Sequence, residues 1–283
     1  ISEYFSLPAE DGFLYEDRLA ALYYAYAMES RNQFVSSWFG FNLTLNNILV
    51  ALTARKFKLD IAPLIVGDTE VCEALRTSGA RDFGLSGEVE WLDILVKISE
   101  TEELVEGMLK EVAPVSRILD IGTGSGCIAV TLSKELPEAE VTAWDISEEA
   151  LAIAGDNNHL LQASVLFVQR DVLTYQPVEG ECFDVIVSNP PYVTEIEKRD
   201  MEPNVLNWEP SRALFVPDSD PLRFYRRIGE LGRSMLTAGG RLYFEINRAF
   251  GEAVASMLRK QGYTNVRIRK DISGNDRYVI AER

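Results

Sequence analysis

From residue 117 onward, hydrophobic and polar positions alternate between short apolar runs, typical of buried strands, and longer stretches with apolar residues at helical spacing. Strands are predicted at Arg117–Ile121, Val141–Trp144, Val165–Val168, Phe183–Ser188, Arg241–Ile246, Val266–Arg269 and Tyr278–Ala281. Helices are predicted at Cys127–Leu136, Glu148–Leu161, Pro221–Leu236 and Ala249–Gln261. This order predicts an α/β fold with a mostly parallel sheet covered on both faces. The closing turn through Gly274 and Asn275 is short, which predicts an antiparallel last strand.

The first 99 residues show no such alternation, and Asp17–Glu29 and Leu45–Lys58 carry apolar residues at helical spacing. The region is rich in aromatic residues: Tyr23, Tyr24, Tyr26, Phe34, Trp38, Phe39 and Phe41. We interpret this aromatic set as a small helical core, with a peptide-binding face as the alternative. Ser99 and Glu102 fit a capping box, which predicts a helix that starts at Ser99 and ends before Pro114. The sequence therefore predicts an all-helical domain over residues 1–99 and a second domain over residues 100–283.

Composition narrows the classes of function. The 283 residues include 28 Lys and Arg against 44 Asp and Glu, a net charge of −16 that disfavours binding to nucleic acid. The single histidine, His159, excludes paired-histidine zinc sites, and no metal is expected. Cys72, Cys127 and Cys182 form no C-x-x-C pair, which favours a reducing cytoplasm. No apolar run reaches membrane-spanning length, so no membrane contact is expected.

A glycine-rich loop follows the first predicted strand and precedes a helix. Its residues are Gly122, Thr123, Gly124, Ser125 and Gly126. Glycines there let the chain turn tightly and let a ligand lie against bare backbone. The third glycine comes one residue too early for the pyrophosphate-binding pattern, and no Lys-Ser/Thr pair follows as in a phosphate loop.

Three aspartates accompany this loop. Asp120 lies beneath it and is placed to face an ammonium group, Asp145 ends the second predicted strand, and Asp171 follows the third. A carboxylate at Asp145 can accept two hydrogen bonds from a ribose diol, and Asp171 lies where an adenine edge would be read. Three carboxylates suit a positively charged ligand with a ribose and suit a diphosphate poorly. S-adenosylmethionine, with its sulfonium, ammonium and ribose, meets these requirements. The alternative is that each aspartate caps a strand or helix.

The fourth predicted strand runs into Asn189, Pro190, Pro191 and Tyr192. Two prolines hold the backbone extended and remove two N–H donors, which leaves nearby carbonyls free to accept. A planar NH2 group can donate one hydrogen to the Asn189 side chain and the other to the Pro190 carbonyl, with Tyr192 stacked on its plane. An amide nitrogen held in this way is aimed at an electrophilic methyl, and oriented acceptors stabilise the charge that grows on it. The alternative is an ordinary Pro-Pro turn.

Residues from about Glu100 to Arg283 resemble the HemK/PrmC protein-glutamine methyltransferases. The matching segments are Glu100-Thr101-Glu102, Asp120–Gly126, Asp145, Asp171, Asn189–Tyr192, Glu209-Pro210, Ala213-Leu214, Phe224-Tyr225-Arg226, Glu245-Ile246, Lys270-Asp271 and Asp276-Arg277. The resemblance implies a seven-stranded Rossmann-like class I methyltransferase sheet. It also implies that the enzyme methylates the glutamine of the Gly-Gly-Gln motif in peptide chain release factors and forms S-adenosylhomocysteine. The implied donor contacts are Gly122, Gly124, Asp145, Val172 and Asn189, and the implied glutamine contacts are Asn189, Pro190 and Tyr192.

The chain departs from that family upstream of the match. Val96-Lys97-Ile98-Ser99 stands where the family usually has Ile-Pro-Arg-Pro, and the usual N-terminal substrate domain is not recognisable. Residues 34–90 resemble instead an uncharacterised family of proteins similar to the C subunit of V-type ATP synthases. Two alternatives follow: an adenine-specific DNA methyltransferase, since Asn-Pro-Pro-Tyr also occurs in those enzymes, and a non-enzymatic assembly protein with a passenger methyltransferase-like domain.

Overall fold

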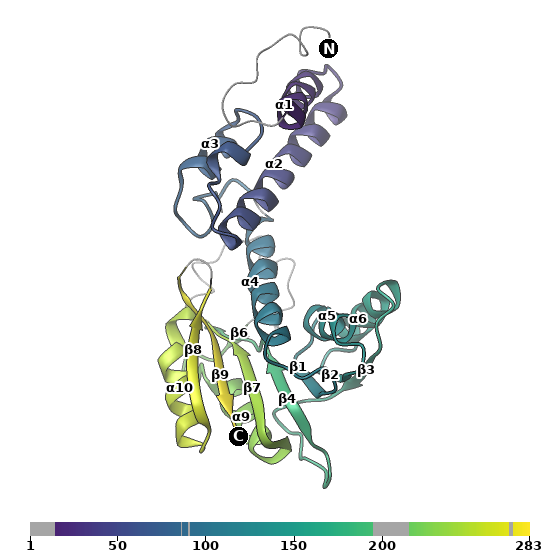
Figure 1. Cartoon of the computed structure of the whole chain (residues 1–283), viewed down its shortest axis with the longest axis vertical. Coiled ribbons are helices and arrows are strands. Elements are labelled where there is room, and N and C mark those ends of the chain that lie inside the picture. Colours follow the sequence, from purple (N-terminus) through teal and green to yellow (C-terminus); the bar gives the residue numbers. More distant parts are fainter. Residues whose placement is uncertain (1–14, 86, 90, 195–214, 272–273) are drawn as a thin grey trace. The chain divides into compact units, whose positions relative to one another are not determined.

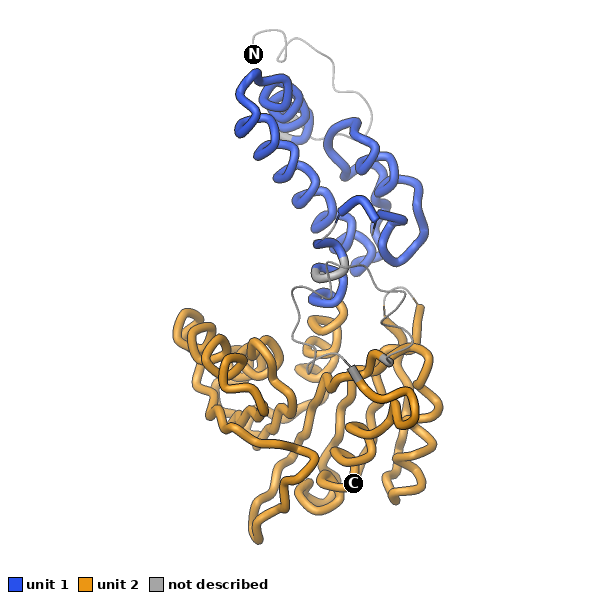
Figure 2. The backbone as a smooth tube through the Cα atoms, turned by 180° about the vertical axis from the view of Figure 1, so that it is seen from behind, with its two compact units in different colours: residues 1–99 blue, residues 100–283 orange. Residues whose placement is uncertain are grey.

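The chain divides into two compact units, residues 1–99 and 100–283 (Figure 2). The computed structural model describes residues 15–283 apart from 86, 90, 195–214 and 272–273. The boundary between the units falls inside one continuous helix, α4 (Leu92–Leu109), labelled in Figure 1.

The predicted helix start at Ser99 is wrong, because α4 begins seven residues earlier, at Leu92. The side chains of Leu92 and Val96 are buried in unit 1, so the apolar pattern that stabilises the helix continues upstream of the capping-box residues. Burial of an apolar helix face outweighs a local capping signal. Ser99 therefore occupies the helix interior.

Unit 1 contains α1 (Tyr15–Met28), α2 (Gln33–Lys56), the 3₁₀ turn η2 (Ala62–Leu64), α3 (Glu70–Thr77) and the first part of α4. The prediction of a helical N-terminal region is confirmed. Its core joins α2 to the segment that follows it, through Ile48, Ala51, Ile65, Cys72, Leu75, Phe83, Leu85, Val89, Leu92 and Val96.

The interpretation of the aromatic set as this core is wrong. Tyr26 and Phe34 are 81% and 74% exposed, and Tyr23, Trp38 and Phe41 are exposed as well. Several of these rings contact one another edge-on, as Tyr23 and Phe39 do with centroids 5.2 Å apart. The residues after α2 pack against Ile48 and Ala51, on another part of that helix, and so leave the aromatic rings outside the core.

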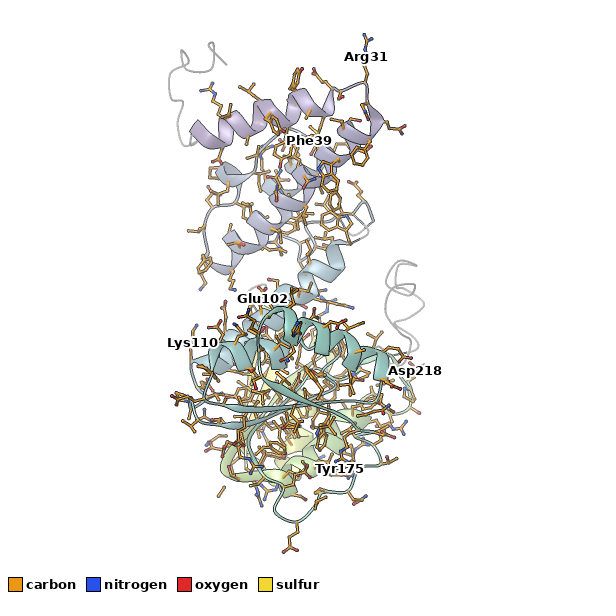
Figure 3. All side chains as sticks on the ribbon, turned by 90° about the vertical axis from the view of Figure 1, so that its right-hand side faces the viewer. Arg31, Phe39, Glu102, Lys110, Tyr175 and Asp218 are labelled. Carbon is orange, nitrogen blue, oxygen red and sulfur yellow. The ribbon has the colours of Figure 1, made fainter. Side chains whose placement is uncertain are left out.

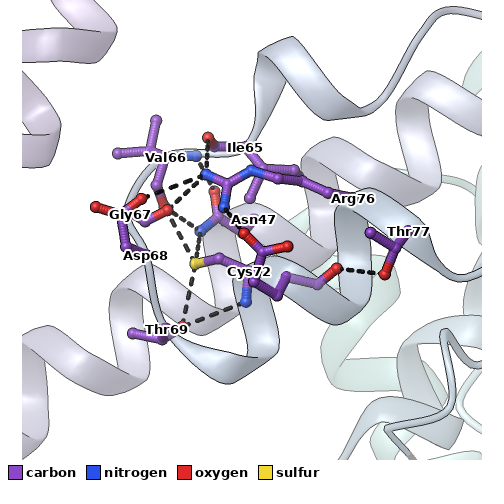
Figure 4. Close-up of polar contacts among 10 residues, drawn as sticks. Asn47, Ile65, Val66, Gly67, Asp68, Thr69, Cys72, Arg76 and Thr77 are labelled. Atoms are coloured by element: carbon purple, nitrogen blue, oxygen red, sulfur yellow. Dashed lines mark hydrogen bonds and ion pairs between the residues drawn. The ribbon is translucent and has the colours of Figure 1, made fainter.

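A polar cluster around Asn47 closes the loop between η2 and α3 (Figure 4). The Asn47 amide donates to the Val66 carbonyl at 2.7 Å and accepts from the Val66 N–H at 3.0 Å. The Cys72 thiol accepts from the Thr69 hydroxyl at 3.1 Å and is 1% exposed. Arg76 donates to the Ile65 carbonyl at 3.0 Å. These contacts assign Cys72 a structural role in the loop.

Unit 2 is built on a seven-stranded sheet. Its strands are β1 (Arg117–Ile121), β2 (Glu140–Asp145), β3 (Val165–Gln169), β4 (Phe183–Ser188), β7 (Leu236–Glu245), β8 (Thr264–Lys270) and β9 (Asp276–Glu282). The strand order is β3-β2-β1-β4-β7-β9-β8, and β9 alone among these strands runs antiparallel to the others. The predicted sheet and its antiparallel last strand are confirmed. A separate parallel pair joins β5 (Val193–Thr194) and β6 (Phe215–Val216).

Helices cover both faces of this sheet (Figure 1). They are α5 (Cys127–Glu135), α6 (Glu148–Leu160), α9 (Arg223–Met235) and α10 (Gly251–Lys260), with the 3₁₀ turn η4 (Arg248–Phe250) before α10. Successive strand residues point to opposite faces. Leu119 therefore packs with α9 and α10 in one core, and Ile118 packs with α5 and the end of α4 in the other.

Side chains fill the space between helices and sheet throughout unit 2 (Figure 3). Tyr175, labelled there, packs edge-on against Trp144 at the end of β2, with ring centroids 4.7 Å apart. Over the described ranges, we find no helix long and apolar enough to span a bilayer.

Candidate active site at the carboxyl edge of the sheet

The candidate residues come together at one edge of the sheet. The order β2-β1-β4-β7 makes the carboxyl ends of these four parallel strands neighbours. Asp145, the glycine loop and Asn189 end or follow three of them. In open parallel sheets, ligands bind beyond this edge.

The glycine loop is held open toward solvent. Gly122, Gly124 and Gly126 have φ angles of 75°, 57° and 84°, which strain any other residue. A Cβ atom at Gly126 would lie 3.0 Å from the Cβ of Ala154, so this glycine also permits close packing with α6. At Gly122 and Gly124, by contrast, a Cβ atom would meet nothing within 4 Å. The loop thus presents bare backbone to an open space.

Hydrogen bonds fix the shape of the loop. Gly122 and Thr123 both donate their N–H groups to the Trp144 carbonyl, at 2.8 and 3.0 Å. The Ser125 carbonyl accepts from the Asn157 side chain of α6 at 2.9 Å. Asp145 accepts from the Gly124 N–H through Oδ2 and from the Ser147 N–H through Oδ1, both at 2.9 Å. Each oxygen of the half-buried Asp145 carboxylate retains a lone pair for a ligand hydroxyl.

Asp120 is fully buried beneath the loop. Its Oδ2 accepts from the Thr123 hydroxyl at 2.7 Å, while Oδ1 has no hydrogen-bond partner among the described residues. Burial and, less strongly, Asp145 raise the Asp120 pKa, hydrogen bonds from the Thr123 hydroxyl and the Ala129 backbone lower it, and the pKa that results is about 7. A buried polar atom without a partner marks a place where a ligand can supply one. The chemistry of the unpaired Oδ1 suits a cation.

Asp171 and Val172 form the turn after β3. Asp171 Oδ1 accepts from the Leu173 N–H at 2.9 Å. One oxygen of Asp171 therefore caps the turn, in line with the alternative interpretation of these aspartates as caps. The Val172 carbonyl accepts from Arg227 of α9 at 3.2 Å, which anchors the turn to that helix.

Asn189 directly follows β4, at the end where β4 is hydrogen-bonded to β1, the strand that precedes the glycine loop. The buried Ser188 hydroxyl donates to the Ile121 carbonyl at 2.6 Å. Pro190 is buried, whereas Asn189, Pro191 and Tyr192 are half-buried. The Tyr192 carbonyl accepts from the Asn247 side chain at 3.5 Å. The segment is thus fixed on both sides, and the side chain of Asn189 keeps partial access to solvent.

Behind Asn189 lies a group of five residues, here called the buried polar cluster. They belong to segments that resemble the family, but the sequence alone assigns them no function: Glu100, Thr101, Glu245, Asp271 and Arg277. All are at most 8% exposed. The Thr101 hydroxyl donates to Glu245 Oε2 at 2.8 Å, and Arg277 bridges Glu100 and Asp271, each at 3.1 Å. The feature of the sequence that could have indicated this cluster is Glu245, a glutamate at the end of an apolar strand.

Two sequence matches, Glu209-Pro210 and Ala213-Leu214, lie outside the described residues. Within the described ranges, no three His, Cys, Asp or Glu side chains are grouped to hold a metal ion. The three cysteines are free.

Two family models match the chain. A methyltransferase small domain matches residues 99–206, and a protein of unknown function matches residues 1–111. The release factor glutamine methyltransferase of Bacteroides thetaiotaomicron is 58% identical over 190 residues, covering 67% of this chain and 68% of that protein. The enzyme of the same name from Flavobacterium psychrophilum is 47% identical, covering 65% and 66%. A solved release factor-specific protein-(glutamine-N5) methyltransferase from Alicyclobacillus acidocaldarius is 29% identical, with a TM-score of 0.40 over 65% of this chain and 91% of that one.

Proposed function

Because the chain belongs to the release factor glutamine methyltransferase family, we propose that it transfers a methyl group from S-adenosylmethionine to a glutamine side-chain nitrogen of a peptide chain release factor. The resemblance of residues 100–283 and the class I methyltransferase fold are confirmed. By the family resemblance, the substrate glutamine is that of the Gly-Gly-Gln motif. The names of the relatives favour this substrate over adenine in DNA and over a non-enzymatic assembly role. The proposed release factor substrate supports the cytoplasm as the place of the reaction, which we propose with it.

The glycine loop and its aspartates fit the methyl donor. When bound, S-adenosylmethionine supplies a methyl group made electrophilic by its sulfonium. Asp145, with free lone pairs, would accept from the ribose hydroxyls, and Asp120 Oδ1 is available for the ammonium group. The remaining proposed donor contacts are Gly122, Thr123, Gly124, Ser125, Gly126, Asp171, Val172 and Asn189.

Asn189, Pro190, Pro191 and Tyr192 would hold the substrate glutamine. The amide NH2 would donate one hydrogen to Asn189 Oδ1 and the other to the Pro190 carbonyl, with Tyr192 against its plane. Two acceptors on one nitrogen favour pyramidalisation and direct its lone pair toward the methyl group. They also stabilise the positive charge that develops on nitrogen in the transition state. This chemistry needs neither a histidine base nor a metal.

The observation that supports this proposal best is the adjacency of Asn189 to the glycine loop, through the paired ends of β4 and β1. Incubation of the full chain with labelled S-adenosylmethionine and a purified release factor is expected to label one glutamine. Peptide mapping identifies the residue. Label on oligonucleotides and none on the release factor would reverse the assignment in favour of adenine.

The affinity for the donor is expected to depend on pH through Asp120. An ammonium group binds the ionised carboxylate, and the Asp120 pKa of about 7 means that ionisation increases across neutrality. We expect the affinity for S-adenosylhomocysteine, measured by calorimetry, to rise roughly tenfold between pH 5.5 and 7.5. Asp120→Asn should bind weakly with a flat profile. A flat profile in the wild type would contradict the assigned partner of Asp120.

We propose that the two compact units are separate domains, 1–99 and 100–283. Their family models differ, which supports a separate origin. The model that matches residues 1–111 describes a protein of unknown function, so the likeness to V-type ATP synthase subunits stays a prediction.

A further inference from the structure

Glu245 stands beside Asn189 in the sheet. β4 and β7 are parallel, and their last registered pair is Ser188 with Phe244. Asn189 and Glu245 each come one residue later, so they occupy matching positions at the carboxyl edge. Side chains at matching positions of parallel neighbours point to the same face. The two residues are therefore lateral neighbours.

The Glu245 carboxyl has one oxygen engaged and one available. Oε2 accepts from Thr101, while Oε1 makes no hydrogen bond of standard geometry with a described residue. Burial and, less strongly, Glu100 raise the Glu245 pKa, while Thr101, Arg277 and the Asn189 side chain lower it, and the pKa that results is about 7. The Asn189 amide thus lies close enough to favour the ionised form of this carboxyl. Glu245 has 1% exposure, so water does not compete for it.

An asparagine amide has an accepting end and a donating end, which are nearly equal in shape. The proposed reaction needs Oδ1 to face the substrate NH2. The opposite end, Nδ2, then needs an acceptor behind it, and an ionised carboxylate accepts but never donates. With Glu245 in place, the flipped amide would set Oδ1 against a carboxylate oxygen.

We infer that Glu245 is a positioning residue, which accepts from Asn189 Nδ2 and thereby fixes Asn189 Oδ1 toward the substrate amide. The inference rests on the proposed function. Two hydrogen bonds keep Glu245 in place: the Thr101 hydroxyl of α4 donates to Oε2, and the Tyr225 hydroxyl of α9 donates to the Glu245 carbonyl at 3.2 Å. The charged groups around it are Glu100 on α4 and Arg277 on β9, with Asp271 beyond Arg277.

Side-chain NMR of the full chain tests the pair without any substrate. We expect the Asn189 NH2 resonances, identified by their loss in Asn189→Asp, to titrate near pH 7 with Glu245. They should shift in Glu245→Gln and lose this titration. A matched control is Glu111→Gln, because Glu111 is a carboxylate that contacts the same strand through Arg241 and Tyr243, which precede Glu245 in β7. Unchanged Asn189 resonances in Glu245→Gln would overturn the pairing.

Kinetics test whether the pair positions Asn189 for transfer. Glu245→Gln is expected to lower kcat about tenfold or more, with the donor affinity and the melting temperature preserved. Asn189→Asp keeps an acceptor for the substrate but places a second carboxylate beside that of Glu245, so we expect a larger loss of kcat than in Glu245→Gln. Combining Asn189→Asp with Glu245→Gln restores a donor–acceptor pair, and we expect kcat to recover at least tenfold over Asn189→Asp. A purely structural Glu245 predicts further loss instead.

The outcomes separate the two proposals. A wild-type chain that fails to label the release factor overturns the proposed function, whereas the NMR titration still decides the Asn189–Glu245 pair. A double variant no more active than Asn189→Asp, in an active wild-type background, overturns the positioning role alone.

Discussion

Asn189→Ala is expected to lower kcat for methyl transfer by about 10²–10³-fold, because it would remove one of the two acceptors that we propose for the substrate NH2. The loss falls on the transition state, where positive charge develops on the nitrogen. Asn189 is half-buried at the edge of the sheet, so its truncation leaves no large cavity. The measurement is single-turnover transfer to a release factor at saturating donor.

Donor affinity separates this role from a general disturbance of the site. Asn189→Ala should bind S-adenosylhomocysteine within a few-fold of the wild type, as calorimetry would measure. Asp145→Ala is the reciprocal control, because Asp145 holds the Gly124 N–H and is assigned to the ribose. That variant should lose donor affinity first. Equal losses of affinity and kcat in Asn189→Ala would refute the assignment to the substrate amide.

Strand positions in unit 2 could be predicted where apolar runs coincide with the strands. Both Arg117–Ile121 and Phe183–Ser188 have the predicted bounds, because nearly all their residues are buried. β7 begins at Leu236 rather than Arg241, since its first half contains Thr237, Gly239 and Gly240, which carry no apolar signal. Pairing with β4 at Leu236 extends the strand through these residues. A local pattern does not contain that long-range contact.

The location of the candidate site at one edge of the sheet could be predicted from strand direction alone. Asp120, Asp145 and Asn189 each end or follow a parallel strand, and parallel strands bring such positions to one edge. Their contacts could not be predicted in the same way. Thr101 and Glu245 are 144 residues apart in the chain, and their hydrogen bond requires both the packing of α4 and the register of β7. A buried carboxylate looks like a surface residue in the sequence.

The largest loss of stability is expected for Arg277→Met. The Arg277 guanidinium bridges Glu100 and Asp271, and the three side chains are 6%, 6% and 1% exposed. Although burial lowers it, the pKa of Arg277 remains above its ordinary value because Glu100 and Asp271 face the guanidinium. Breaking a buried ion pair by removing one partner costs about 3–5 kcal/mol, since the remaining charge is left without compensation. We expect a loss of that size in the free energy of unfolding of unit 2.

Amide hydrogen exchange in the full chain measures this loss of unfolding free energy in the part of unit 2 that contains Arg277. The Ile246 N–H donates to the Arg277 carbonyl at 2.9 Å and reports on the junction of β7 and β9. Arg269→Met is the matched control: its ion pair with Glu111 is 3.7 Å long and the arginine is 45% exposed, so a loss below about 1 kcal/mol is expected. Adding Glu100→Gln to Arg277→Met removes one uncompensated carboxylate and should recover part of the stability. If Arg277→Met cost no more than Arg269→Met, the cluster would not be the buried charge network that these contacts describe.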